Sequence, residues 1–208
     1  MKVSHVLYKV DRLKDGVEKF RHEGFKVDYG SKKNPHNGLI YFSEGPYIEL
    51  VDSNSISSYV RYGLRLIGKG KVADRFKRWK QVEEGFFGMC LENYSTDFTV
   101  EETILKKHGQ RYFIAKSSRI DPQDRTLKWK LLFPYELYLP FLMTYFTIDP
   151  KPKEFIHPNG VKGISKICFG TEDKLIPIID ELCNDTILEL TIGKGVQSVD
   201  YVYAKTDS

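Results

Sequence analysis

Apolar and polar positions alternate in short runs at the start of the chain, and one stretch with helical spacing interrupts them. Residues 5–10 form the first alternating run, and Leu13, Val17 and Phe20 then recur at the i, i+4 and i+7 positions of a helix. Three more runs that are rich in β-branched and aromatic residues follow, at 25–29, 38–42 and 47–51. The pattern predicts one strand, one helix and three further strands.

The same order of elements returns twice. Residues 86–91 predict a strand, and Val100, Ile104 and Leu105 give the next helix its apolar stripe. Three further strands are predicted at 112–115, 126–133 and 141–146. A shorter third copy is predicted from a strand at 163–169, a helix with Leu175, Ile179 and Leu182, and strands near 187–192 and 199–204. Pro177 lacks an amide hydrogen, so this last helix should start late or be kinked.

These repeats predict an α+β protein built from tandem βαβββ modules, with an inserted helical segment and a partial third module. A spacing of roughly 80 residues between copies is too long for a solenoid and fits a duplicated supersecondary unit. The predicted units are the first module over 1–53, the helical connection over 54–84, the second module over 85–150 and the partial third module over 151–208. We expect them to form one compact globular unit.

The charge balance argues against nucleic acid as a partner. The net charge is +4, but 32 basic residues are interleaved with 28 acidic ones along the whole chain. The densest basic run, Lys69–Lys80, has Val72, Phe76 and Trp79 at helical spacing beneath it. This arrangement is typical of the solvated face of an amphipathic helix.

Several absences point to a cytoplasmic protein without a nucleotide cofactor. No apolar leader precedes the first run, and the longest apolar stretch, Leu131–Phe146, is interrupted by Pro134 and Pro140. We therefore expect neither secretion nor a membrane partner. The three cysteines form no CxxC pair, which fits a reducing compartment. The sequence also has no glycine-rich phosphate loop, so no nucleotide cofactor is predicted.

Several segments together resemble a known group of proteins. The segments 5–11, 37–42 and 47–51 resemble the first module of the glyoxalase-like proteins of the vicinal oxygen chelate (glyoxalase/bleomycin resistance/dioxygenase) superfamily, and the likeness continues at 85–91, 125–130, 139–142 and 157–161. The resemblance implies that paired modules curl their strands into a curved mixed-sheet cup that holds a small molecule. In metal-using members of this group, a His on the first strand and a Glu on the last strand of a module bind the metal. His5 and Glu49 occupy these two places.

The resemblance implies a divalent-metal site, with Mn, Ni, Zn or Fe as the candidate ions. His5 and Glu49 are the matching ligands, and a third ligand would have to be His157 or His36. Glu49 either binds the metal or acts as the catalytic base. In the second module, the aligned positions hold Phe86 or Gly88 and Met143 or Thr144, none of which is a good metal ligand. The alternative is that His5 is a hydrogen-bonded core residue, that Glu49 pairs with Lys9 or another base, and that His157 belongs to a simple turn.

Four further residues are candidates for binding the substrate. Asn37 opens an otherwise apolar strand, where its amide could orient a ligand or complete a turn, and Tyr47 shares the face of Glu49. On the strand predicted at 126–133, Lys128 and Lys130 share one face, and Leu127, Trp129 and Leu131 share the other. If the lysines face the cup, they favour an anionic or oxygen-rich ligand, and otherwise they face solvent.

Two functions compete on these grounds. The first is a glyoxalase-like protein that binds a small molecule in a β-cup and acts as a divalent-metal-dependent lyase, isomerase or dioxygenase. The second is a metal-free protein that binds and sequesters a drug or metabolite. The missing ligands of the second module favour the second function, whereas His5 and Glu49 favour the first. The chain has enough modules to close a cup alone, so a homodimer stays an open option.

Overall fold

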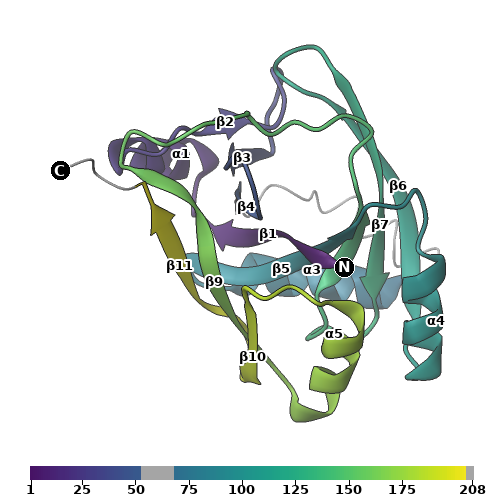
Figure 1. Cartoon of the computed structure of the whole chain (residues 1–208). Coiled ribbons are helices and arrows are strands. Elements are labelled where there is room, and N and C mark those ends of the chain that lie inside the picture. Colours follow the sequence, from purple (N-terminus) through teal and green to yellow (C-terminus); the bar gives the residue numbers. More distant parts are fainter. Residues whose placement is uncertain (53–67, 205–208) are drawn as a thin grey trace.

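The computed structural model of the protein describes residues 1–52 and 68–204. Eight strands form one curled sheet in the order β2-β3-β4-β1-β5-β8-β7-β6, and three strands form a second, smaller sheet in the order β10-β9-β11 (Figure 1). The strands of the large sheet are β1 (Lys2–Lys9), β2 (Asp28–Tyr29), β3 (Asn37–Ile40), β4 (Tyr47–Val51), β5 (Gly85–Asn93), β6 (Tyr112–Ile120), β7 (Thr126–Pro134) and β8 (Phe141–Thr144).

The strand order of the large sheet is symmetric about the central β1–β5 pair. β1 runs parallel to β4 and β5 runs parallel to β8, whereas β1 and β5 are antiparallel to each other. Each half of the sheet therefore has the order βαβββ, with its first and last strands side by side. This arrangement confirms the predicted fold class, a curved mixed sheet built from tandem modules.

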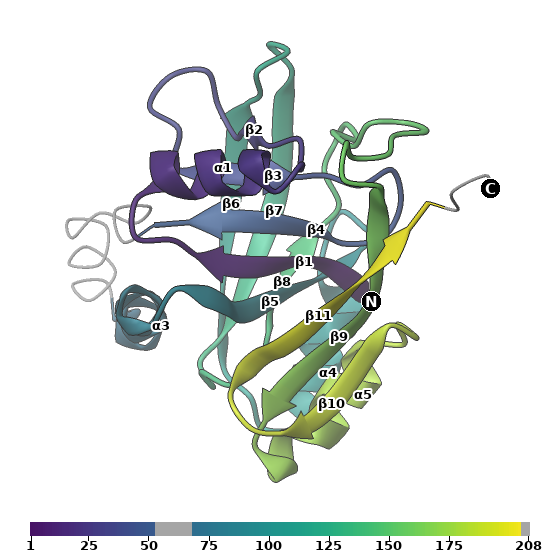
Figure 2. The same ribbon diagram turned by 90° about the vertical axis from the view of Figure 1, so that its left-hand side faces the viewer.

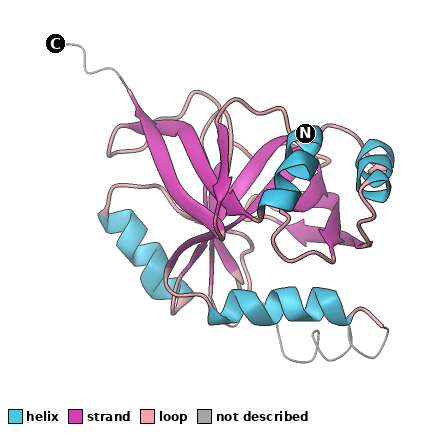
Figure 3. Cartoon of the chain, turned by 90° about the horizontal axis from the view of Figure 1, so that it is seen from below, coloured by secondary structure: helices cyan, strands magenta, loops and turns pink. Residues whose placement is uncertain are grey.

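Two helices, α1 (Leu13–His22) and α4 (Thr99–Lys107), cover the convex face of the large sheet, and the helices lie around the outside of the strands (Figure 3). The predicted stripe of Leu13, Val17 and Phe20 is buried on α1 and packs in the same apolar cluster as Val6 of β1. Gly24 follows the helix with a φ of +82°, a left-handed conformation that glycine adopts without strain. The hydrophobic periodicity of the sequence thus correctly predicted which residues of α1 pack against the convex face of the sheet.

The third predicted unit is present as a strand-helix-strand-strand unit. It contains β9 (Val161–Thr171), a 3₁₀ turn (Asp173–Leu175), α5 (Ile176–Leu182), β10 (Leu188–Ile192) and β11 (Gly195–Tyr203). Pro177 lies in the first turn of α5, where its missing N–H costs nothing, so the helix starts late as predicted. β11 packs against β5, and the small sheet crosses the outside of the β1–β5 pair (Figure 2).

The predicted helical connection over 54–84 lies partly outside the described residues. Its described part contains α3 (Gly70–Gln81), which places Val72 and Phe76 in the cluster on the concave side of the sheet. The division of the chain into four units stays a prediction.

Within the described residues, no helix has the length and apolarity needed to cross a bilayer. The longest helix among the described residues, α3, has 12 residues, and about 20 apolar residues are needed to span the hydrocarbon core.

A buried arginine joins α3 to the segment that leads into β8. Arg75 is 3% exposed, and its guanidinium donates to three backbone carbonyls. Nη1 donates to Leu139 O at 2.9 Å, and Nη2 donates to Pro134 O at 3.0 Å and to Glu136 O at 2.6 Å. One side chain therefore satisfies carbonyls that have little access to water.

We predict that Arg75→Met lowers the free energy of unfolding by roughly 3 kcal/mol, because buried carbonyls lose their donors. Urea unfolding followed by circular dichroism measures the change. The matched control is Lys77→Met on the exposed face of the same helix, which should change the value by less than about 0.5 kcal/mol. Equal effects of the two substitutions would contradict the assigned role of Arg75.

Candidate functional site

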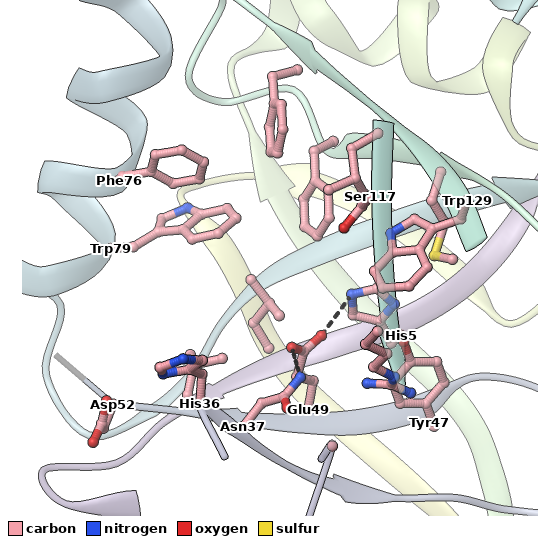
Figure 4. A pocket seen from close by; sticks show the side chains of 18 of the residues that line it. His5, His36, Asn37, Tyr47, Glu49, Asp52, Phe76, Trp79, Ser117 and Trp129 are labelled. Atoms are coloured by element: carbon pink, nitrogen blue, oxygen red, sulfur yellow. Dashed lines mark hydrogen bonds and ion pairs between the residues drawn. The ribbon is translucent and has the colours of Figure 1, made fainter. Parts of the chain in front are cut away.

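The concave face of the large sheet and α3 enclose a cavity of about 380 Å³ (Figure 4). Aromatic side chains form a large part of its wall: Tyr47, Phe76, Trp79, Trp129, Phe133, Phe141 and Phe146. Polar side chains also line it: His5, Ser31, His36, Asn37, Glu49, Asp52, Lys80, Ser117 and Arg119. An apolar cavity with a few converging polar groups is the usual form of a small-molecule site.

Three neighbouring strands bring the polar residues of the first module together. β1 pairs with β4, which places His5 opposite Tyr47 and Leu7 opposite Glu49, and β3 pairs with the other edge of β4. His5 Nε2 lies 3.2 Å from Glu49 Oε2, and Asn37 Nδ2 donates to Glu49 Oε1 at 2.6 Å. The structure therefore places three of the predicted site residues in direct contact at one side of the cavity (Figure 4).

Burial determines the protonation of His5. Its side chain is 4% exposed, and burial lowers the pKa of His5 to about 3, with smaller contributions from the cations Arg119 and Lys151. The ring is therefore neutral near pH 7. Ser4 Oγ donates to Glu92 Oε2 at 2.8 Å and lies 3.1 Å from His5 Nδ1, so a lone pair of the hydroxyl can accept the Nδ1 proton. With the Ser4 hydroxyl donating to Glu92, the proton of the neutral ring lies on Nδ1 and the lone pair on Nε2.

The surroundings of Glu49 act on its pKa in opposite directions. Burial raises the pKa of Glu49, while the hydrogen bond from Asn37 and the charge of Arg119 oppose the rise. Nε2 of His5 is buried without a hydrogen bond, although Glu49 Oε2 is close to it.

The predicted third metal ligand, His157, does not join His5 and Glu49. Both of its ring nitrogens bond to backbone atoms: Nδ1 accepts from Lys26 N at 2.9 Å, and Nε2 lies 3.0 Å from Tyr41 O. His157 is 2% exposed and does not line the cavity, so its role here is structural. His36, the other candidate, does line the cavity.

The second module offers no compensating ligands. When β4 and β8 are aligned at their first residues, Cys90 takes the place of His5 and Met143 takes the place of Glu49. The prediction of Phe86 or Gly88 opposite His5 is therefore corrected to Cys90, whereas Met143 is as predicted. Burial raises the pKa of the Cys90 thiol well above its ordinary value, so the thiol stays protonated.

The donor set does not fit a resident metal held by protein side chains alone. Among residues 1–52 and 68–204, no three His, Cys, Asp or Glu side chains converge on one point. His5 Nε2 and Glu49 are the two donors in place, and catalytic metal sites ordinarily use three protein ligands. The cation Arg119 also lies near enough to perturb the pKa values of both residues.

Two of the predicted substrate-binding residues line the cavity and two do not. Asn37 and Tyr47 contribute to the wall. Lys128 and Lys130 lie on the opposite face of β7, because it is Trp129 of the same strand that faces the cavity. The predicted separation of the two faces is present, but the lysine face is turned away from the cup.

The most informative residue that the sequence did not single out is Arg119. It lines the cavity from β6, and Nη2 donates to the Tyr41 hydroxyl at 2.7 Å. The strand was expected to end at Ala115, whereas β6 continues to Ile120. The polar alternation of residues 116–120 gave little sign of the longer strand, although its period of two does place Ser117 and Arg119 on one face.

The chain was compared with protein families, curated proteins and solved structures. A family model described as a glyoxalase-like domain matches residues 3–180. A search of the curated proteins gives no significant match. Among solved structures, a hypothetical protein from Staphylococcus aureus has a TM-score of 0.68 at 19% identity, with 100% of this chain and 93% of that chain covered. The Mn(II)-bound glyoxalase from Novosphingobium aromaticivorans has a TM-score of 0.58 at 11% identity, with 96% of this chain and 64% of that chain covered.

The low pKa of His5 should make folding stability depend on pH. Folded His5 titrates at about 3 and an unfolded histidine at 6.5, so between these values the unfolded state binds more protons. The contribution of His5 to stability is therefore present above pH 6.5 and is lost as the pH falls towards 3. Glu49 contributes with the opposite sign, because its folded pKa is raised.

We predict that His5→Gln flattens the dependence of the unfolding free energy on pH between 6.5 and 4 by up to about 1.4 kcal/mol per pH unit. Urea unfolding at a series of pH values measures the slope. The control, His22→Gln, changes an exposed histidine of α1 and should leave the slope as in the wild type. An unchanged slope in His5→Gln would show that His5 is protonated in the folded protein.

Proposed function

The chain belongs to the family of glyoxalase-like domain proteins, and on that premise we propose that it binds an aromatic or otherwise planar small molecule in its cup without a resident metal ion. The observation that carries the proposal is the cavity itself. Its volume of about 380 Å³ suits a small ligand, and flat aromatic side chains face it from both modules and from α3. A ring placed among these side chains would bury apolar surface on several sides.

The polar side of the cavity would orient such a ligand. Asn37, Glu49 and His5 form one connected group, in which the lone pair of His5 Nε2 has no hydrogen bond. A hydroxyl or N–H group of a ligand could donate to the carboxyl group of Glu49, whose side chain is 19% exposed. Recognition therefore needs no metal ion in this arrangement.

A second candidate function is the metal-dependent lyase, isomerase or dioxygenase that the resemblance implies. One observation favours it: a buried imidazole nitrogen with a free lone pair lies 3.2 Å from a carboxylate oxygen, and a cation would relieve their repulsion. The number of protein donors argues against this function. His5 and Glu49 are two donors, so a ligand or water would have to fill the remaining coordination positions of the metal ion. The likeness to an Mn(II)-bound glyoxalase, at 11% identity, supports a shared fold and no more.

Intrinsic fluorescence can test ligand binding directly. The chain has two tryptophans, Trp79 and Trp129, and both line the cavity. We predict that 4-nitrobenzamide, a neutral aromatic quencher, lowers their emission with a saturable dependence on concentration. Ser117→Phe fills part of the cavity and should abolish the saturable phase.

The matched control for this titration is Ser118→Phe, the neighbouring and exposed position of β6, which should bind as the wild type does. Purely linear quenching in all three proteins would mean that the cavity does not take an aromatic ligand.

The metal content of protein purified without a tag or chelator distinguishes the metal-free function from the metal-dependent one. We predict substoichiometric Mn, Ni, Zn and Fe by elemental analysis, and no thermal shift when these ions are added, because two donors hold a cation weakly. Stoichiometric metal that is lost in both His5→Ala and Glu49→Ala would instead establish the second candidate. Including His36→Ala shows whether that residue supplies a third ligand.

A further inference from the structure

Arg119 brings a positive charge to a cavity wall that has many aromatic side chains. It extends from β6, an edge strand of the large sheet, towards Tyr41, which follows β3 in the first module. Gly30 leaves room for this reach, because a Cβ atom there would lie 3.2 Å from Nη1 of Arg119. The guanidinium therefore lies where the two modules approach each other across the cup.

This guanidinium has no carboxylate within ion-pair distance in the part of the chain that the structure describes. None of the ion pairs among the described residues includes Arg119, whose one hydrogen-bond partner there is the neutral hydroxyl of Tyr41. Its Nε is buried without any partner. By contrast, the neighbouring Arg125 pairs with Asp121 at 2.7 Å. A half-buried cation without an anion costs stability unless something else compensates it.

The polar groups of β1, β3 and β4 contact one another and make no ion pair with Arg119. The carboxyl group of Glu49 is already in contact with Asn37 and His5, and burial raises its pKa. His5 is neutral. Arg119 is thus a cation of the cavity wall that lies beside, and makes no ion pair with, the connected group of His5, Asn37 and Glu49.

Two aromatic rings define what can lie beside this charge. The guanidinium carbon is 5.9 Å from the ring centre of Trp129 and 5.6 Å from that of Phe146. Both rings also line the cavity. A ligand whose anionic group binds the guanidinium would therefore have its next atoms against aromatic surface, which favours a flat and apolar body.

We propose that the ligand of this cavity is a planar, aromatic or conjugated carboxylate, with its anionic group on Arg119 and its ring among Trp129, Phe146 and the facing aromatic side chains. This inference rests on the proposed function, because it names the class of ligand for the same cavity. A neutral amide of the same shape fits the aromatic wall equally well but leaves Arg119 without an anion, so the site discriminates between the two.

The test compares 4-nitrobenzoate with 4-nitrobenzamide at pH 7.5 by quenching of tryptophan emission. These probes differ mainly in charge, and both tryptophans of the chain line the cavity. In the wild type we expect the carboxylate to bind roughly tenfold more tightly than the amide. A charge-assisted hydrogen bond between the carboxylate and Arg119 accounts for a gain in affinity of this size. Arg119→Gln should remove this preference and leave binding of the amide within about twofold.

The control variant is Arg111→Gln, which removes the same charge from an exposed residue just before β6 and should keep the wild-type preference. Binding of the amide by Arg119→Gln also shows that this variant retains a folded cavity. If both probes bind the wild type equally, the proposed ligand class is wrong while the binding function stands. If neither probe binds, the binding function itself is overturned. A preference that persists in Arg119→Gln would assign anion recognition to another residue.

Discussion

The antiparallel pairing of β1 with β5 joins the two modules, and the cavity depends on its register. His5 lies opposite Cys90 and Leu7 lies opposite Gly88, so these four residues share the concave face. Gly88 keeps this region open, because an added Cβ atom would lie 3.1 Å from Leu7 Cδ1. A slip of one residue would turn His5 towards the convex core and break its contact with Glu49. Since β4 and β8 pair with the outer edges of β1 and β5, the same register also decides which of their side chains reach the cavity.

The two halves of the sheet have the same topology but different chemistry. The first module supplies a connected polar group of His5, Asn37 and Glu49, whereas the positions related by symmetry in the second module are occupied by Cys90 and Met143. Ligands from both modules would surround a metal ion, but ligands from one module leave half of its coordination open. The second module instead contributes aromatic rings and Arg119. The first module thus supplies polar side chains on one side of the cavity, and the second supplies the aromatic and cationic side chains that a flat, charged ligand would contact.

Local sequence patterns predicted the strands well, but they could not decide which face of a strand meets the cavity. β4 was predicted with its observed bounds, because turn residues precede a run that is rich in β-branched and aromatic residues there. In β7 the period of two separates Lys128 and Lys130 from Trp129, yet the curl of the whole sheet decides which set is concave. Local patterns also could not predict the structural role of His157. Its hydrogen-bond partner Lys26 is 131 residues away in the sequence, so the residues near His157 give no sign of the contact. The family resemblance, on the other hand, implied that His5 and Glu49 lie together, and the parallel pairing of β1 with β4 brings them into contact.

Buried polar atoms without partners are costly, and their positions argue that the cavity is a binding site and not a packing defect. Three such side-chain atoms occur among the described residues: Nε2 of His5, Nε of Arg75 and Nε of Arg119. The guanidinium of Arg75 has three other hydrogen bonds, so its remaining N–H is a small loss within a satisfied group. His5 and Arg119 come from different modules and both face the cavity. A packing defect would be expected to expose apolar atoms, whereas here His5 and Arg119 bring polar side chains to the cavity wall from two modules.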